Sequence, residues 1–401
     1  MNKEKIVLGF SGGLDTTYCV KYLSDDRNFE VHSIIVNTGG FSEEELVAVE
    51  KHAYNLGVKT HTTINAIQSY YESIIKYLVY GNVLKNNTYP LSVSAERLSQ
   101  AIHIAEHVIK LDARYVAHGS TGAGNDQVRF DMIFNIMIPD IEIITPIRDL
   151  KLSREAEIEY LAKKGVIINT EKAAYSINKG LWGTSIGGKE TLQSLGMIPE
   201  LAWPTQVTKS ETERVDLHFV KGELVGINDA KFDNPVHAIQ GLQAIASPFG
   251  IGRDVHVGDT IIGIKGRVGF EAAAPILIIK AHHALEKHVL TKWQLSWKDQ
   301  LSQFYGTWLH EGQILDPVMR DIESFLESSQ ANVTGSVTLE LNPYRYQVIG
   351  IMSPFDLMSS KFGSYGEMNQ GWSGEDVRGF TKIFGNQVSI FHKVKNSQTS
   401  K

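Results

Sequence analysis

The sequence predicts an α/β protein with a doubly wound parallel sheet at its N-terminus, followed by a second α+β domain and a C-terminal tail. Short apolar runs alternate with helical patterns through about the first 165 residues, which is typical of βαβ units. After about residue 170 glycines become dense and short runs of alternating apolar residues appear in pairs, as in antiparallel hairpins. We therefore predict domains over 1–168, 169–362 and 363–401.

The first domain is expected to contain five strands, at 6–10, 31–36, 58–64, 115–118 and 141–144. Helical patterns fill the intervals, over 14–23, 42–56, 67–80, 94–110 and from 153 onward. Ser42 and Glu45 have the spacing of a capping box, Gly57 ends that helix, and Ser153 begins the last one. Since ligands bind at the carboxyl ends of strands in such sheets, we expect a site there.

The second domain is expected to contain an antiparallel sheet. Apolar residues alternate over 215–219 and 224–227 around a Lys-Gly-Glu turn, and again over 337–341 and 344–348 around Asn-Pro. Helices are predicted over 275–290 and 316–328, the second with Asp316 as N-cap and Pro317 at its first position. Residues 176–188 are expected to be a Gly-rich loop, and 388–391 a short strand in the tail.

Composition excludes several classes of protein. The chain has 401 residues, ordinary apolar and charged fractions of 42% and 21%, and a net charge of −6, which does not favour general nucleic-acid binding. Its single cysteine, Cys19, excludes an intrachain disulfide or a Cys-pair metal site. Since we identify neither a membrane-spanning segment nor a signal peptide, we expect a cytoplasmic protein that does not bind membranes.

A phosphate-binding loop is predicted where the first strand meets the first helix, at Ser11-Gly12-Gly13-Leu14-Asp15-Thr16. Its glycines let the backbone approach an anion, and the helix that follows directs free N–H groups at it. The loop lacks the Walker and dinucleotide-binding patterns. It resembles instead the S-G-G-x-D-[S/T] loop of the ATP pyrophosphatases, which split ATP between its α and β phosphates.

A second motif follows the predicted strand 115–118, at His118-Gly119-Ser120-Thr121-Gly122-Ala123-Gly124-Asn125-Asp126-Gln127-Val128-Arg129-Phe130. With the first motif it resembles the argininosuccinate synthase family, which carries S-G-G-L-D-T and G-x-T-G-x-G-N-D-Q-V-R-F at this spacing. Segments 89–97, 175–185, 262–271 and 379–380 also resemble that family, so the likeness covers nearly the whole chain. It implies a ligase in arginine biosynthesis that joins citrulline and aspartate at the expense of ATP, through a citrullyl-AMP intermediate, and releases AMP and pyrophosphate.

The resemblance also implies which residues bind each substrate. ATP, with Mg²⁺ bridging its phosphates and no ion held by the protein alone, would contact Gly9, Phe10, Ser11, Gly12, Gly13, Leu14, Asp15, Thr16, Thr17, Val36 and Gly119. Aspartate would contact Thr121, Asn125 and Asp126, with the Asp126 carboxylate facing its ammonium. Citrulline would contact Tyr89, Ser94, Asn125, Arg129, Ser176 and Ser185, and the positions of Gly258 and Phe270. The family is typically a homotetramer whose C-terminal segment reaches a neighbouring subunit.

The citrulline end departs from the family pattern. Gly258 and Phe270 stand where the family usually has a Glu and a Tyr that contact citrulline, and Gly266 and Ala123 replace a Ser and a Lys. Free citrulline remains the expected substrate, with a neighbour such as Asp259 replacing the lost Glu. In the alternative explanation, loss of a carboxylate and a hydroxyl makes the pocket wider and less polar, which would suit an Nα-acylated citrulline.

The sequence disfavours several other functions. Another adenylating ligase of the same superfamily, such as a transfer-RNA modifier, is disfavoured by the acidic charge and the lack of a Cys pair. A non-catalytic nucleotide-binding regulator is disfavoured by the two intact motifs. His282-His283 indicates a packed helix rather than a metal site, and Trp293, Trp297 and Trp308 indicate core or interface positions. Pyrophosphate release with ATP, aspartate and citrulline would discriminate among these functions.

Overall fold

A computed structural model describes residues 3–167, 175–359, 363, 365–366 and 371–399. The chain divides into two compact units, Met1–Pro354 and Phe355–Lys401, which are described separately. The predicted boundary at 168/169 falls outside the described residues. Within the described part of the chain, no helix is both long and apolar enough to cross a membrane.

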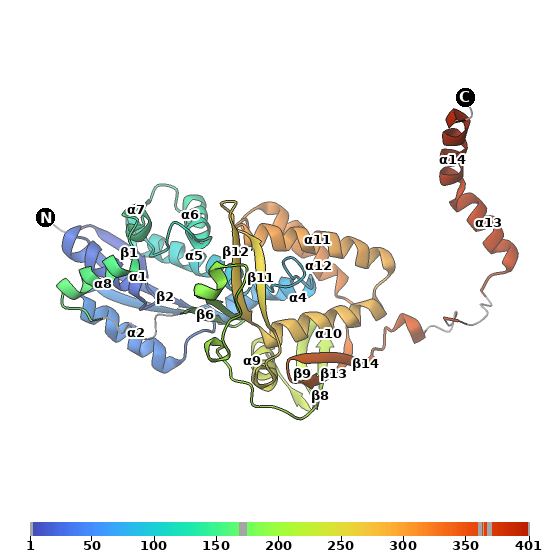
Figure 1. The fold of residues 1–401 in the computed structure, drawn as a ribbon, viewed down its shortest axis with the longest axis horizontal. Coiled ribbons are helices and arrows are strands. Elements are labelled where there is room, and N and C mark those ends of the chain that lie inside the picture. The colour runs from blue at the N-terminus through green and yellow to red at the C-terminus, as the bar shows by residue number, and fades with distance from the viewer. Residues whose placement is uncertain (1–2, 168–174, 360–362, 364, 367–370, 400–401) are drawn as a thin grey trace. The chain divides into compact units, whose positions relative to one another are not determined.

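The predicted N-terminal sheet is confirmed (Figure 1). Five parallel strands lie in the order β3-β2-β1-β4-β5, with bounds Lys5–Gly9 (β1), Glu30–Asn37 (β2), Thr60–Asn65 (β3), Tyr115–Ala117 (β4) and Glu142–Ile144 (β5). Side chains of successive residues enter different cores: Ile6 and Leu8 join one cluster with Cys19, whereas Val7 joins another with Leu98. Both faces are therefore covered, as in a doubly wound fold.

Helices cover each face of this sheet. On the face of Ile6 and Leu8 lie α1 (Leu14–Lys21), α2 (Glu43–Leu56), α7 (Pro146–Asp149) and α8 (Arg154–Lys163). On the face of Val7 lie α3 (Ile67–Tyr70), α4 (Lys76–Tyr80), α5 (Ser92–Leu111) and α6 (Asp126–Met137). A π-helical turn, Tyr71–Ile75, joins α3 to α4, so the predicted helix over 67–80 is continuous but not uniformly α-helical.

The helix ends follow the predicted signals with one exception. Ser42 and Glu45 form the capping box of α2, and Gly57 ends that helix with φ +98°. Ser153 caps α8 by accepting a hydrogen bond from the Ala156 N–H. The prediction that helix α5 begins at Ser94 is wrong, because Leu91, at φ +63°, precedes a first turn that already contains Ser94. The Ser94 hydroxyl is thus available for a role other than capping.

The predicted antiparallel sheet of the second half is also confirmed. Its order is β10-β9-β8-β13-β14, with bounds Glu213–Val220 (β8), Glu223–Ile227 (β9), Ala230–Lys231 (β10), Gly335–Asn342 (β13) and Arg345–Met352 (β14). It packs against α9 (Pro235–Ala246) and α10 (Ala273–Val289), with α11 (Lys292–His310) and α12 (Pro317–Ser329) alongside. Asp316 caps α12 and Pro317 is its first residue, as predicted.

A third sheet replaces the loop expected around 176–188. Strands β6 (Ser176–Gly180), β7 (Gly183–Gly187), β11 (Arg253–Asp259) and β12 (Lys265–Glu271) form an antiparallel sheet in the order β11-β12-β7-β6. The glycine-rich sequence predicted a loop here, but Ser176 lies on β6 and Ser185 on β7. The glycines permit close packing: a Cβ on Gly183, at φ +117°, would lie 2.8 Å from the Ala272 side chain.

His282 is buried in α10, as predicted, where its ring accepts or donates hydrogen bonds with Asn82 and Gln330. Trp293 and Trp297 do not belong to the core, since they are 66% and 58% exposed on α11. Trp308 is partly buried and stacks on Phe304. The described residues contain no group of three His, Cys, Asp or Glu side chains that could hold a metal ion.

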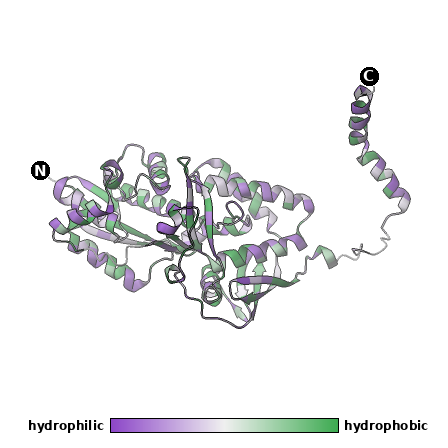
Figure 2. Ribbon diagram, in the orientation of Figure 1, coloured by the Kyte–Doolittle hydropathy of each residue, from purple (hydrophilic) through white to green (hydrophobic). Residues whose placement is uncertain are grey.

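Among its described residues, the second unit contains the α-helices α13 (Gly374–Phe384) and α14 (Asn386–Thr399). The strand predicted at 388–391 is wrong, because this segment lies within α14. Its β-branched and aromatic residues favoured a strand over four positions, but apolar residues recur at Phe380, Phe384, Val388 and Phe391, which is a helical spacing. Figure 2 shows hydrophobic and hydrophilic residues alternating along both helices.

Candidate active site

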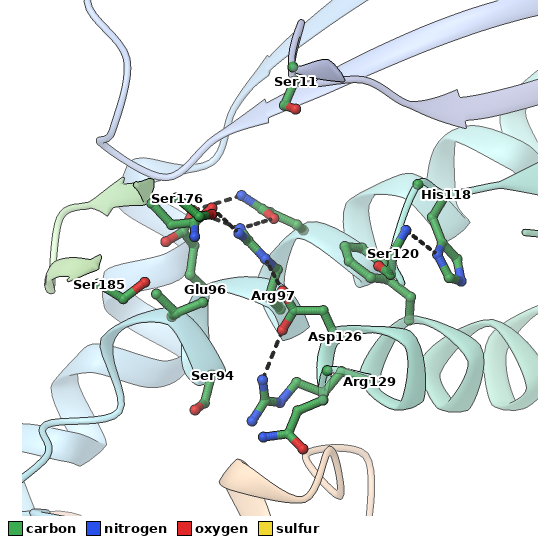
Figure 3. A pocket seen from close by; sticks show the side chains of 18 of the residues that line it. Ser11, Ser94, Glu96, Arg97, His118, Ser120, Asp126, Arg129, Ser176 and Ser185 are labelled. Carbon is green, nitrogen blue, oxygen red and sulfur yellow. Dashed lines mark hydrogen bonds and ion pairs between the residues drawn. The ribbon is translucent and has the colours of Figure 1, made fainter. Parts of the chain in front are cut away.

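A cavity of about 1040 Å³ lies at the carboxyl ends of β1, β2 and β4. The first turns of α1, α5 and α6 border it, as do β6, β7, β11, β12 and the last residue of α11. Segments far apart in the sequence therefore meet here, and Figure 3 shows several of their polar side chains converging. All the predicted site residues line this cavity except Gly12, Thr17 and Phe270.

The phosphate loop forms one end of the cavity. Gly12 has φ +77° and Gly13 is the N-cap of α1, a helix start that no side chain of the described residues caps. The Ser11 and Thr16 hydroxyls lie 3.4 Å apart beside this helix end, and Ser11 points into the cavity (Figure 3). Free N–H groups, a helix dipole and two hydroxyls together suit an anion such as a phosphate.

Gly119 brings the second motif close to this loop. A Cβ on Gly119 would lie 3.3 Å from backbone and side-chain atoms of Asp15 and Thr16. Thr17, by contrast, faces inward: it is 0% exposed and its hydroxyl bonds His52 Nε2 at 3.0 Å. Thr17 therefore supports the loop from behind rather than facing the cavity.

Two carboxyl groups meet beneath the loop. Burial raises the pKa of Glu157, on α8, to about 8, and the neighbouring Asp15 carboxyl adds to this rise. Burial also raises the pKa of Asp15, opposed by a hydrogen bond with Glu157 and the charge of Arg154. The Glu157 carboxyl is therefore largely protonated near neutral pH, which keeps a second negative charge away from the predicted phosphate site.

Asp126, at the start of α6, is held by two arginines. Its Oδ2 accepts from Arg97 Nε and its Oδ1 from Arg129 Nη1, both at 3.0 Å (Figure 3). Burial would raise the pKa of Asp126, but the charges of Arg97 and Arg129 hold it below its usual value. The Asp126 carboxylate is therefore ionised and already paired, and a substrate ammonium would join an existing ion cluster.

Arg97 extends this cluster towards β6. Its Nη2 donates to Asn178 Oδ1 at 2.8 Å and its Nη1 to Gln100 Oε1 at 2.9 Å. The adjacent Glu96 is 2% exposed, and its Oε1 pairs with Arg97 Nη1 at 3.3 Å. Arg97 and Glu96 were not predicted as site residues, although Arg97 ends the segment 89–97 that carries part of the family resemblance.

The residues predicted for citrulline surround the opposite end. Tyr89 Oη accepts hydrogen bonds from Ser92 Oγ at 3.2 Å and from the Val93 N–H at 3.0 Å, so its own proton is available to a ligand. Arg129 is 3% exposed, and its Nε and Nη2 donate to the His310 carbonyl at 3.1 and 3.0 Å. Ser176 and Ser185 approach from β6 and β7 (Figure 3).

The expected widening beside Gly258 does not occur. A Cβ on Gly258 would lie 2.5 Å from His256 Nε2, so the imidazole occupies the space that a side chain at 258 would need. Phe270 is 1% exposed, contacts the Tyr89 ring with centroids 5.3 Å apart, and does not line the cavity. Asp259 lines the cavity, but its carboxylate pairs with Lys265 at 2.6 Å. This geometry does not favour an acylated substrate.

His256 and His310 were missed by sequence reasoning. They lie on β11 and at the end of α11, and no motif marks them. The imidazole of His256 stacks on Tyr89 with centroids 5.2 Å apart, and His310 Nδ1 lies 3.1 Å from Ser94 Oγ. Only the folded chain brings residues separated by 216 positions, such as Ser94 and His310, into contact.

Comparison with known proteins covers the whole chain. The family model described as "Arginosuccinate synthase N-terminal HUP domain" matches residues 5–167, and the family model described as "Arginosuccinate synthase C-terminal domain" matches residues 175–391. The chain is 37% identical over 408 residues to the argininosuccinate synthase of Xanthomonas campestris pv. campestris, covering 98% of this chain and 100% of the relative. It is 37% identical over 393 residues to that of Methanocaldococcus jannaschii (97% and 98% covered). It is 34% identical over 412 residues to that of Xylella fastidiosa, with both chains fully covered.

Proposed function

The chain belongs to the argininosuccinate synthase family, and from this premise we propose that the cavity catalyses the ATP-dependent ligation of citrulline and aspartate. The observation that carries the proposal is one cavity with a phosphate loop at one end and the Asp126–Arg129 ion pair at the other. Such a cavity can hold a nucleotide and an amino acid side by side.

The reaction proceeds in two displacements. The ureido oxygen of citrulline attacks the α-phosphorus of ATP, the α–β phosphoanhydride bond breaks, and pyrophosphate leaves. The aspartate amine then attacks the ureido carbon, loses a proton, and the C–O bond to AMP breaks. Uncapped N–H groups at the start of α1, with the Ser11 and Thr16 hydroxyls, stabilise the negative charge that develops on pyrophosphate.

The substrates are assigned to the cavity by the residues that border it. ATP contacts residues 9–11 and 13–16, Val36 and Gly119, and aspartate contacts Thr121, Asn125 and Asp126. Citrulline lies between Arg129 and the pair Ser176 and Ser185. Mg²⁺ bound with ATP would be held through the phosphates and would neutralise part of their charge, because this ion usually keeps several waters. Chelation of Mg²⁺ should stop pyrophosphate release, and added Mg²⁺ should restore it.

The test is pyrophosphate release with each substrate omitted in turn. Release should require ATP and citrulline, and argininosuccinate should form only when aspartate is added. Citrulline labelled with ¹⁸O in the ureido group should transfer the label to AMP, because that oxygen becomes part of the phosphate. Label retained in the amino-acid product, or release that is independent of citrulline, would exclude this chemistry.

We also propose that the chain forms a homotetramer through its C-terminal helices and acts in the cytoplasm. Phe380, Ile383 and Phe384 on α13 are 62–78% exposed, and Val388 and Phe391 on α14 are 61% and 63% exposed. An apolar helix face of this kind is typical of a surface covered by another subunit. Removal of residues 374–401 should lower the number of chains per particle, measured by light scattering. An unchanged number of chains would place the interface elsewhere. Cell fractionation would test the location.

A further inference from the structure

The cavity wall beside Ser94 contains two histidines that the proposed chemistry leaves without a role. His310 is 7% exposed and His256 is 6% exposed, and both line the cavity. His310 Nε2 and His256 Nδ1 are buried atoms that have no hydrogen-bond partner among the described residues. Buried polar groups nearly always have partners. Because both residues also line the cavity, a ligand bound there is the partner that these two atoms lack.

The tautomer of His310 follows from its neighbours. Arg129 Nη2 lies 3.3 Å from His310 Nδ1 and can only donate, and Ser94 Oγ lies 3.1 Å from the same nitrogen. Nδ1 is therefore an acceptor, and the single proton of the neutral ring lies on Nε2. Burial lowers the pKa of His310 to about 3, and the positive charges of Arg129 and Lys85 lower it further. His310 thus holds a neutral N–H donor within the cavity wall, unpartnered among the described residues.

His256 is held next to this donor. Its ring stacks on Tyr89 with centroids 5.2 Å apart, and Gly258 leaves the space for its Nε2. His256 is close enough to His310 to contribute to the lowered pKa of that residue. Burial lowers the pKa of His256 as well, and the charge of Lys85 adds to the effect. The wall therefore combines the neutral Nε2–H donor of His310 and the unpartnered Nδ1 of His256 with the nearby cations Arg129 and Lys85.

This combination suits an anion rather than an ammonium. Of the carboxylates near this wall, Asp259 pairs with Lys265 and Asp126 with two arginines. Asp254, also on β11, is close enough to His256 to oppose the fall in its pKa. The backbone of Asp259 lies near His310 and opposes the fall in its pKa, but forms no hydrogen bond with Nε2. The Tyr89 hydroxyl and the His310 Nε2–H are both donors without a partner in the described part of the chain. Near the positive charges of Arg129 and Lys85, such donors bind a carboxylate strongly.

We propose that His310 and His256 bind the α-carboxylate of citrulline and determine specificity for it. Citrulline is then recognised mainly through its carboxylate, and Gly258 is required because it lets the His256 imidazole lie against the strand. This inference rests on the proposed function, since it assigns one end of the substrate in the same cavity. His310 also positions Arg129, because its carbonyl oxygen and its Nδ1 accept hydrogen bonds from the Arg129 guanidinium.

A pair of substitutions separates the two nitrogens of His310. His310→Asn places an amide oxygen near the position of Nδ1 and removes the Nε2 donor, whereas His310→Gln places an amide nitrogen near Nε2. We expect His310→Asn to raise KM for citrulline about 10- to 100-fold, the usual loss of one hydrogen bond to a charged group, with KM for ATP unchanged. His310→Gln should raise it less. Gly258→Ala, which displaces His256, should also raise KM for citrulline selectively.

Citrullinamide, which has no α-carboxylate, identifies the group that is bound. Wild-type enzyme should use it poorly, and His310→Asn should weaken it no further, because the contact is already absent. Equal effects of His310→Asn on citrulline and citrullinamide would overturn the inference. His237→Asn, at an exposed histidine on α9, is the matched control and should change neither constant. If wild-type enzyme releases no pyrophosphate with citrulline, the proposed function fails; if it does and the His310 variants match it, only this inference fails.

Discussion

Replacement of Asp126 by Asn tests how the cavity is held together. The carboxylate joins Arg97 on α5 to Arg129 on α6, with both ion pairs at 3.0 Å. Asn keeps the size of the side chain but removes the charge, leaving the 3%-exposed Arg129 uncompensated. Breaking a buried ion pair costs roughly 3–5 kcal/mol, and since Asp126 itself is 34% exposed we expect about 2–4 kcal/mol of lost stability.

Urea unfolding of both proteins at several pH values measures this loss. The arginines hold the pKa of Asp126 below its usual value, so the stability it supplies is present above about pH 4 and is lost as the pH falls through its folded-state pKa. The difference between wild type and Asp126→Asn should therefore shrink as the pH is lowered from 7 towards 3. Glu159→Gln, which breaks a 70%-exposed pair with Lys163, is the control and should leave the unfolding midpoint unchanged.

The same variant tests the role of Asp126 in the reaction. We expect Asp126→Asn and Asp126→Ala to abolish argininosuccinate formation while ATP still binds, because the phosphate loop is separate from this ion cluster. A destabilisation no larger than that of Glu159→Gln, or one independent of pH, would refute the structural argument. Wild-type dependence of the rate on aspartate would refute the catalytic one.

Three further predictions concern other elements. Gly12→Ala, strained at φ +77°, should weaken binding of ATP and pyrophosphate far more than that of aspartate in titration calorimetry; equal weakening of all ligands would indicate a damaged fold. Glu157→Gln should become more stable relative to wild type as the pH rises from about 5 to 9, because stability linked to a raised pKa is lost as the pH rises through it; a constant difference in urea midpoints would exclude the raised pKa of Glu157. Asp316→Ala should cost about 1 kcal/mol through loss of the α12 cap, measured by urea unfolding, with every KM unchanged.

The sequence predicts those parts of the fold that local patterns encode. Strand β1 and helix α2 follow from an apolar run and from the Ser42–Glu45 capping box, since both signals lie within a few neighbouring residues. Strands β6 and β7 were not predicted, because dense glycine has no hydrophobic period and acquires strand geometry only by pairing with β12. The strand predicted at 388–391 is wrong because the apolar pattern is clear but short, and a four-residue window cannot distinguish a strand from one turn of helix.

The site residues likewise fall into two groups, those that local motifs reveal and those that only the fold brings together. Ser11 and Asp126 lie in motifs whose spacing can be read from the sequence, and both border the cavity. His310 cannot be found this way, because its role depends on the end of α11 lying against Ser94 and Arg129. The prediction that Gly258 widens the pocket is wrong, because the sequence does not show that the imidazole of His256, two residues away on the same strand face, occupies that space.

The folding of the second half and the geometry of the substrate site are linked through Arg129. Its Nη1 pairs with Asp126 on its own helix, while Nε and Nη2 donate to the carbonyl of His310 at the end of α11. The C-terminal turn of a helix has unsatisfied carbonyls, so the guanidinium caps α11 while α11 fixes the guanidinium. A shift of α11 would therefore move Arg129 and the His310 donor together, and the proposed citrulline wall would lose both contacts at once. In this proposal, recognition of citrulline depends on a helix of whose described residues only the last lines the cavity.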